Sequence, residues 1–434
     1  MLVSSPIITV GAVLVALSSS VHAASRVEVE QSQMPTCTVF ANGNKTDDVP
    51  NILEAFSTCG NGGSVVFPER ENYWIATRLN PVVRNVYIEW HGQWTMSDDL
   101  TYWRNNSCPI AFQNHAASFI LTGDGIYIDG YGIGGIHGNG DAWYNAEKNV
   151  TQPGRPMPFV FWNVSDVTVK NFFVKQSPLW SLNIMNGTNM DFDNIYCNAT
   201  ATNAPYRANW VQNTDGFDTM DAYNIRLRNF VYQGGDDCLA IKPRSYNIVV
   251  QNMTCHGGNG PAIGSLTQYP EDASVENVKI TDVTILKANS YIRNAIYIKT
   301  WIGIPTLQSS YESADLPRGS GWGSVRNILF ANFDVQGADS GASITQENGR
   351  VINSTTPGSS LMEVSNVQFV NFTGWLEGGE RAGSVSCATA HPCFNVEYQN
   401  VSLSLNQSSA PVSTGRCTFS REGGVTGLSG GGCD

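Results

Sequence analysis

The sequence has little charge, no helix-like charge pattern and no long apolar segment beyond its first residues. Only 14% of the 434 residues are charged, and 37 acidic against 25 basic side chains give a net charge of −12. Phosphate backbones bind to basic surfaces, so this balance argues against a nucleic-acid partner. The 42 glycines, with many Asn, Thr and Val residues, favour an all-β chain instead.

Metal-binding motifs are also missing. None of the ten cysteines forms a Cys-x-x-Cys pair, and no His/Cys cluster has the spacing of zinc ligands. We therefore expect no metal and no cofactor. An even number of cysteines favours disulfides, which form in the secretory compartment and not in the cytosol. Their connectivity is not fixed by sequence, but the short separations favour the pairs Cys238–Cys255 and Cys387–Cys393.

The first residues are typical of a secretory signal peptide. An apolar stretch from Ile7 to Leu17 precedes a small-residue cleavage site at Val21-His22-Ala23, although no Lys or Arg comes before it. The stretch is too short to span a bilayer, and no later segment could span one, so we expect no membrane anchor. Residues 1–23 are thus predicted as signal peptide and residues 24–434 as one extracellular domain. Eleven N-x-Ser/Thr sequons agree with export and are candidate glycosylation sites: Asn44, Asn105, Asn149, Asn163, Asn186, Asn198, Asn252, Asn353, Asn371, Asn400 and Asn406.

A seven-residue motif occurs eight times after residue 160. Each copy has Asn or Asp at its first and sixth positions and apolar residues in alternation; the first copy runs from Asp166 to Phe172. Alternation is the pattern of a strand with one buried face, and Asn at a corner tolerates left-handed backbone and can bond to its counterpart one coil away. This repeated motif predicts a solenoid of about ten coils. A two-sheet sandwich would also have short strands, but they would not share a repeated motif. The other copies begin at Asn189, Asn224, Asn247, Asn277, Asn327, Asn366 and Asn395.

Solenoids need caps over their terminal coils. The segment Asn51–Cys59 is expected to form a short amphipathic helix over the first coil. Residues 405–434, which include Cys417 and Cys433, are expected to cover the other end.

Three polar clusters recur at an interval of 22 residues. Asp215, Asp237 and Asn259 occupy equivalent places, and Asp236 precedes the second of them. Since about 22 residues make one coil, these side chains are expected to stack in one cleft. Adjacent acids repel, so the pKa of one should rise and create the general acid that glycosidic hydrolysis requires. Taken singly, Asp215 could form an Asx turn and Asp236–Asp237 a calcium loop; the shared register favours catalysis.

Four segments resemble the motifs of the polygalacturonase family, glycoside hydrolase family 28. They are NTDGFD, GGDDCLAIKP, CHGGNGPAIGSL and AIYIKTW, and the similarity extends from about residue 35 to the C-terminus. The resemblance implies a right-handed parallel β-helix and inverting, single-displacement hydrolysis of pectic α-glycosidic bonds. It assigns proton donation to Asp236. It implies that Asp215 and Asp237 hold and deprotonate the attacking water.

Two positions depart from the family pattern. Asn259 stands where His is usual, and Tyr297 replaces an Arg two residues before Lys299. Both side chains can still bond a sugar hydroxyl. We therefore expect Asn259, Tyr297, Lys299 and Lys242 to bind substrate, with Lys299 the strongest candidate for a substrate carboxylate.

Exo-acting relatives resemble this chain in two places. One is the segment from Gly264-Ser265-Leu266 to Tyr269, and the other is a long insertion after the AIYIKTW motif, which contains Lys299. Residues 301–324 are expected to block one end of the cleft and to restrict cutting to the chain terminus. The sequence therefore predicts a secreted, monomeric exo-polygalacturonase that releases galacturonic acid from the non-reducing end of homogalacturonan.

Three alternatives stay open. An exo-acting rhamnogalacturonan hydrolase of the same family is favoured by Asn259 and Tyr297. A pectate lyase would share the fold but would need calcium and would leave unsaturated products. A non-catalytic solenoid that binds the cell wall would not need Asp236 at all.

Overall fold

The computed structural model describes residues 34–148, 150–287, 293–308, 310–348, 358–377, 381–407, 409–420 and 423–433. The predicted signal peptide and the sequons at Asn149 and Asn353 lie outside these residues. From Pro35 onward the chain forms one compact unit. The boundary between signal peptide and domain stays a prediction.

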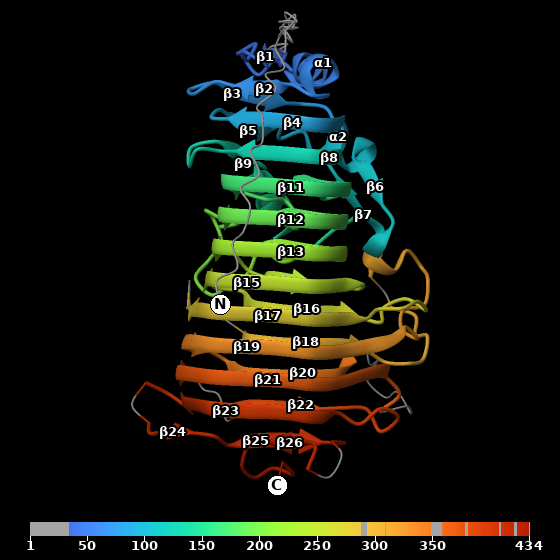
Figure 1. Cartoon of the computed structure of the whole chain (residues 1–434), viewed down its shortest axis with the longest axis vertical. Helices are drawn as coiled ribbons and strands as arrows, with labels where there is room; N and C mark the ends of the chain where they lie inside the picture. Colours follow the sequence, from blue (N-terminus) through green and yellow to red (C-terminus); the bar gives the residue numbers. More distant parts are fainter. Residues whose placement is uncertain are drawn as a thin grey trace, which may run out of the picture. The chain divides into compact units, whose positions relative to one another are not determined.

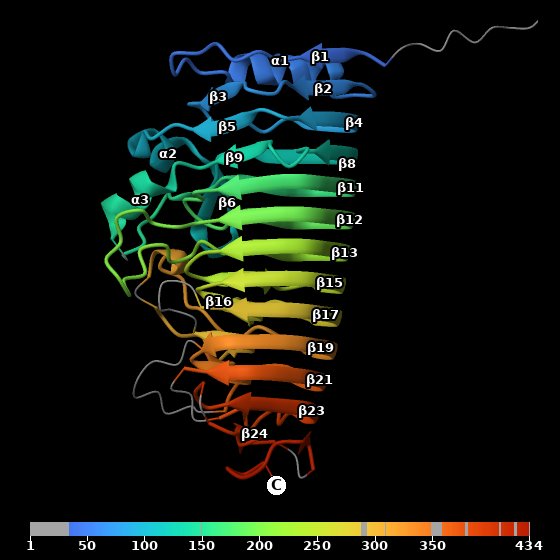
Figure 2. The same ribbon diagram turned by 90° about the vertical axis from the view of Figure 1, so that its left-hand side faces the viewer.

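Parallel strands are stacked coil upon coil into a right-handed parallel β-helix, as predicted (Figures 1 and 2). Each strand of the main stack pairs in parallel with the next, and the steps from β2 to β23 make ten coils. The stack consists of β1 (Thr36–Thr38), β2 (Ser64–Phe67), β4 (Val82–Trp90), β8 (Ile120–Asp129), β11 (Phe159–Lys175), β12 (Leu182–Asn198), β13 (Phe217–Gln233), β15 (Ser245–His256), β17 (Val275–Leu286), β19 (Trp322–Ala338), β21 (Leu361–Leu376), β23 (Phe394–Ser404) and β26 (Val425–Thr426).

Shorter strands complete the coils. Near the N-terminus these are β3 (Asn72–Ile75), β5 (Gln93–Met96) and β9 (Gly135–His137). From the middle onward they are β14 (Asp237–Ile241), β16 (Asn259–Leu266), β18 (Asn294–Trp301), β20 (Ser340–Asn348), β22 (Gly383–Ser386) and β25 (Gly415–Thr418). The first residues of β13 pair with β14, and β14 pairs with β16. This second column of parallel strands carries the polar clusters.

The repeated Asn and Asp residues form hydrogen-bonded ladders at the corners. Asn189, Asn224 and Asn247 have φ values of 57°, 59° and 59°, the left-handed conformation that Asn tolerates. The amide of Asn224 donates to Asn189 at 3.0 Å, and that of Asn247 donates to Asn224 at 3.1 Å. The repeated Asn thus forms the turn at the corner and binds each coil to the next, as the repeated motif predicts.

The apolar residues of the repeated seven-residue motif form columns inside the solenoid. Val167, Met190, Ile225, Ile248 and Val278 are in register on successive strands, and each is at most 2% exposed. Aromatic rings stack in the same way near the C-terminal end, where Phe369 and Tyr398 have centroids 4.7 Å apart. Burial of these columns is the main stabilising contribution to the fold.

Both ends of the described chain are capped. Helix α1 (Val49–Cys59) buries Ile52 and Phe56 against the first coil, which confirms the predicted cap. A disulfide joins its last residue to Cys37, and another joins Cys417 to Cys433 at the opposite end. None of the helices in the described ranges has the length and apolarity to cross a bilayer.

The two disulfides expected from sequence are also present, joining Cys238 to Cys255 and Cys387 to Cys393. Cys108 and Cys197 are buried and unpaired, so not every cysteine serves as a cross-link. Nine of the eleven sequons are described. Asn198 is half-buried and the other eight are exposed.

Two helices and a small three-stranded sheet lie outside the coils, along one flank of the stack. Helices α2 (Leu100–Asn106) and α3 (Gly140–Glu147) lie there, with a small sheet of β6 (Cys108–Ile110), β7 (His115–Ala117) and β10 (Pro156–Met157). The turn η1 (Phe112–Asn114) joins β6 to β7, and η2 (Tyr311–Ser313) lies in the insertion after β18. Strand β24 (Pro411–Val412) turns back antiparallel to β23.

Candidate active site

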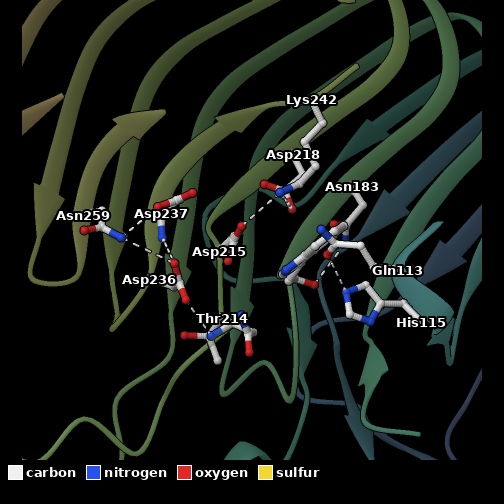
Figure 3. A network of polar contacts seen from close by, with 12 residues as sticks. Gln113, His115, Asn183, Thr214, Asp215, Asp218, Asp236, Asp237, Lys242 and Asn259 are labelled. Atoms are coloured by element: carbon white, nitrogen blue, oxygen red, sulfur yellow. Dashed lines mark hydrogen bonds and ion pairs between the residues drawn. The ribbon is translucent and has the colours of Figure 1, made fainter. Parts of the chain in front are cut away.

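The 22-residue interval corresponds to one coil. Phe217 pairs with Leu239, and Asp237 pairs with Asn259, so the two register shifts are both 22 residues. Asp215 precedes Phe217 by the same two residues that separate Asp237 from Leu239. The three polar clusters therefore lie side by side, as the interval predicts (Figure 3).

Asp237 is buried among hydrogen-bond donors. Its Oδ1 accepts from Asn259 Nδ2 at 2.8 Å and from the Tyr297 hydroxyl, and its Oδ2 lies 3.3 Å from Lys299 Nζ. Lys299 Nζ also donates to the Tyr297 hydroxyl at 2.7 Å. Donors to both oxygens stabilise the ionised carboxylate. Asp237 is therefore suited to act as a base.

Asp236 is half-buried and directed toward a different segment. Its Oδ2 accepts the backbone N–H of Asn213 at 2.9 Å, and its Oδ1 accepts that of Asp237 at 2.9 Å. Burial and the adjacent charge of Asp237 outweigh these bonds and raise the pKa of Asp236 above its ordinary value. A carboxyl group with a raised pKa beside a second carboxyl group in a different environment is the pair that general acid–base catalysis requires.

Asp215 shares one lysine with a further acid. Lys242 Nζ lies 3.4 Å from Asp215 Oδ2 and 3.7 Å from Asp218 Oδ2, and all three side chains are at most 6% exposed. Burial, followed by the charge of Asp218, raises the pKa of Asp215 well above its usual range. Burial alone would lower the pKa of Lys242, but the carboxylates of Asp218 and Asp215 outweigh it and raise that pKa.

The acids open onto a polar hollow that is continuous with solvent. Asp215, Asp236 and Asp237 line it together with Lys242 and Lys299. Other side chains come from distant parts of the chain and form its walls: Gln113, Trp180, Asn213, Ser265, Gln268, Ser310, Glu312 and Arg318.

One wall is built where η1 meets the segment after β16 and the insertion after β18. Gln113 Nε2 donates to Gln268 Oε1 at 2.6 Å, and the backbone N–H of Gln113 donates to the Tyr269 hydroxyl at 3.1 Å. The Tyr269 hydroxyl in turn donates to the Glu312 carbonyl at 3.4 Å. A continuous chain of contacts thus joins segments that are up to 199 residues apart and bounds the hollow on this flank.

The structure gives the expected substrate-binding residues different surroundings. Asn259 and Tyr297 both face Asp237, so their amide and hydroxyl are directed at a carboxylate rather than only at the hollow. Lys299 lies at the edge of the hollow with its side chain 23% exposed. Lys242 is held between two acids and over the Trp180 ring, 4.0 Å from its centroid.

Several functional candidates were not expected from sequence. Asp218 is the last residue of the NTDGFD segment, three residues after Asp215, so this motif could have identified it as a candidate. Arg318 is 6% exposed and lies over the Trp301 ring at 4.3 Å, in the insertion that was expected to matter only as a block. Gln113 gave no local signal, because its role depends on contacts made 155 and 156 residues away.

Carboxyl groups held in separate environments in one polar cleft are the arrangement that glycosidic hydrolysis requires. The sequence profile described as Glycosyl hydrolases family 28 matches residues 111–420. The chain belongs to this family, which confirms the resemblance seen in the motifs.

Relatives extend the comparison. A protein of Aspergillus niger named galacturan 1,4-alpha-galacturonidase C is 63% identical over 395 residues, which cover 91% of this chain and 93% of that one. A protein of the same name from Neosartorya fischeri is 59% identical over 401 residues, 91% of this chain and 92% of that one. The crystal structure of endo-xylogalacturonan hydrolase from Aspergillus tubingensis aligns with a TM-score of 0.76 and 25% identity, covering 91% of this chain and all of that one.

Proposed function

We propose that this protein is a secreted exo-polygalacturonase, a galacturan 1,4-alpha-galacturonidase that releases galacturonic acid from the non-reducing end of homogalacturonan. The observation that carries the proposal is the hollow itself, in which three acids lie beside a wall built by η1 and the insertion after β18. The names of the relatives that are 63% and 59% identical support the same activity. The four disulfides agree with an extracellular protein.

The proposed reaction is a single displacement at the anomeric carbon. Asp236 gives its proton to the glycosidic oxygen as the bond between that oxygen and C1 breaks. A water held by Asp237 and Asp215 attacks C1 from the opposite face, and one of these carboxylates takes its proton. The donors around Asp237 hold its carboxylate oxygens in position for the attack.

Cations at the edge of the hollow are proposed to hold the uronate carboxylate. Lys299 is partly exposed beside Asp237, and Arg318 lines the hollow from the insertion. A planar guanidinium matches a carboxylate with two parallel hydrogen bonds. Lys242 is less suited to this task, because two protein carboxylates already surround its ammonium group.

Replacing Arg318 by Gln is expected to raise KM for oligogalacturonides roughly 10- to 100-fold, since a hydrogen bond to a charged group contributes about 1.5–3 kcal/mol. kcat should fall less, because Arg318 lines the hollow from the insertion after β18 and is not one of the residues proposed to transfer protons. Steady-state kinetics on trigalacturonate measure both constants. The matched control is Arg326→Gln, which removes an exposed arginine paired with Glu276 at 2.9 Å on β19. Equal KM values for the two variants would contradict the role of Arg318.

Product analysis on defined oligosaccharides tests the proposal as a whole. Incubation with homogalacturonan oligomers should release monomeric galacturonate from the first time point, with the β-anomer formed first from the α-linked substrate. Appearance of mixed-length oligomers would contradict exo-action. Unsaturated ends would indicate a lyase, which membership of a hydrolase family already argues against.

The rhamnogalacturonan alternative is tested in the same experiment with rhamnogalacturonan oligomers. From sequence, Asn259 and Tyr297 favour this alternative, but both side chains contact Asp237. Their departure from the family pattern therefore has a role within the acid cluster and need not signal a different sugar. Product from the rhamnogalacturonan set alone would reverse the choice.

A further inference from the structure

Two buried polar side chains next to the acid cluster lack the donors that their oxygens need. Asn183 and Asp218 are paired in register on β12 and β13 and are 0% and 2% exposed (Figure 3). Asn183 Nδ2 donates to the carbonyls of Phe159 and Trp180 at 3.0 Å each, which leaves its Oδ1 facing away from them. Among the described residues, neither this Oδ1 nor either carboxylate oxygen of Asp218 has a hydrogen-bond partner.

Three adjacent buried acceptors without a donor are costly, because each has lost its hydrogen bonds to water without a replacement. A proton on Asp218 removes the problem. Neutral Asp218 has one O–H donor. Its neighbour in the register, Asn183 Oδ1, is an acceptor that lacks one.

Lys242 is the cation nearest to Asp218, but its contacts favour Asp215. Its Nζ is within hydrogen-bond distance of Asp215 Oδ2 at 3.4 Å, while Asp218 Oδ2 is at 3.7 Å and makes no bond. Asp215 also lines the hollow, whereas Asp218 does not. One buried ammonium group cannot neutralise two carboxylates, so one of the two acids retains a proton.

The other groups around Asp218 act in the same direction. Burial, followed by the charges of Asp237 and Asp236, raises the pKa of Asp218 to about 7, because Lys242 and, more weakly, Lys299 offset them only in part. His115 supplies no second cation: burial, then Lys242, Arg155 and Arg318, lower its pKa to about 3, so it is neutral. Burial raises the pKa of the Cys197 thiol, which is therefore neutral as well.

We propose that Asp218 is a neutral carboxylic acid that donates to Asn183 Oδ1, and that it is thereby the positioning residue that leaves Lys242 as the counter-ion of Asp215. After burial, the charge of Asp218 is the largest cause of the raised pKa of Asp215. A neutral Asp218 removes that charge, so Asp215 can ionise and hold the attacking water. This inference rests on the proposed function for its consequence, because the water is the nucleophile of that reaction. The protonation state itself does not depend on the substrate.

The test is the difference in thermal stability between Asp218→Asn and wild type as a function of pH. The amide of Asn can donate to Asn183 Oδ1 as the acid does, but it does not titrate. Since the folded-state pKa of Asp218 is raised from 3.8 to about 7, its contribution to wild-type stability is present below pH 4 and lost as pH rises through about 7. Relative to wild type, the Tm of D218N should therefore rise by roughly 2 °C or more between pH 4 and pH 8.

An ionised Asp218 stabilised by Lys242, directly or through water, gives the opposite sign. D218N would then lose stability relative to wild type as pH rises from 4 to 8, and that result would overturn the proposal. A D218N protein that fails to fold would overturn it too, because a site that holds a neutral acid must accept an isosteric amide. Infrared difference spectra of wild type minus D218N at pH 5.5 should contain a carboxylic-acid C=O band. Absence of that band contradicts protonation directly.

Asp48→Asn is the matched control for a buried Asp. Both oxygens of Asp48 accept backbone N–H groups, from Asn42 at 2.6 Å and Trp74 at 2.7 Å, so an amide there faces a donor with a donor. Burial also raises the pKa of Asp48, so the two variants are compared at pH 4, where D48N should be less stable than wild type and D218N should not. Neither readout uses turnover. Failure of the proposed hydrolase activity would therefore leave this test intact, and failure of this test would leave the hydrolase assignment intact.

Discussion

Replacing Asp236 by asparagine is expected to lower kcat for oligogalacturonide hydrolysis roughly 10²- to 10⁴-fold, the usual contribution of a positioned general acid. The amide cannot supply a proton to the glycosidic oxygen. Its carbonyl can still accept one of the two backbone N–H bonds, from Asn213 or Asp237, that orient the carboxyl group. KM should therefore change little. Steady-state kinetics on trigalacturonate and calorimetric titration of the same ligand measure the two effects separately.

The matched control for this change is Asp191→Asn. Asp191 lies on β12 with its side chain 31% exposed and is paired with Arg228 at 3.0 Å, so the substitution removes one surface carboxylate of the same type. It should leave kcat unchanged. Wild-type turnover by D236N would show that another group donates the proton, and would make a non-catalytic solenoid or a different acid the better hypothesis.

The coil architecture was predictable because its signal is local and repeated. Asn189, Asn224 and Asn247 combine left-handed backbone with a bond to the next coil, so the same residue recurs wherever the chain turns that corner. The interval between Asp215, Asp237 and Asn259 follows from the same geometry. Once the period is known, residues one coil apart are neighbours.

The walls of the hollow were not predictable in the same way. Gln113 contacts Gln268 and Tyr269 across more than 150 residues, and no repeat relates these positions. Arg318 lies in an insertion that interrupts the coil period, so the register gives no location for it. Loops that leave the solenoid have no template coil, and their contacts follow from side-chain packing alone.

The surroundings of the substituted family positions were also hidden from sequence. Asn259 and Tyr297 were expected to face substrate, yet both donate to Asp237 Oδ1. Spacing places a residue on a coil but does not determine which neighbour its polar atom contacts. The same limit applies to Lys242. Its position after β14 is set by the register, whereas its burial between Asp215 and Asp218 depends on the Trp180 ring beneath it.

Replacing Lys242 by methionine is expected to destabilise the fold by about 3–5 kcal/mol at neutral pH, the range for removing one partner of a buried ion pair. Methionine fills the space of the lysine stem over Trp180 but supplies no charge, so Asp215 loses its counter-ion. Because the pKa of Asp215 is already raised, the uncompensated acid will take up a proton at acidic pH. The stability loss should therefore be smaller at pH 4 than at pH 7, and denaturant titrations at the two pH values measure it.

Activity should respond in the same direction. A protonated Asp215 cannot hold the attacking water as an acceptor, so kcat of K242M is expected to fall roughly 10²-fold or more even where the protein is folded. Lys45→Met provides the control, since Lys45 is 67% exposed and 4.0 Å from Asp98, a pair of the kind that contributes about 0–1 kcal/mol. A stability loss in K242M that is the same at pH 4 and pH 7 would mean that Asp215 does not depend on this ammonium group, and would place the structural role of Lys242 in its apolar stem.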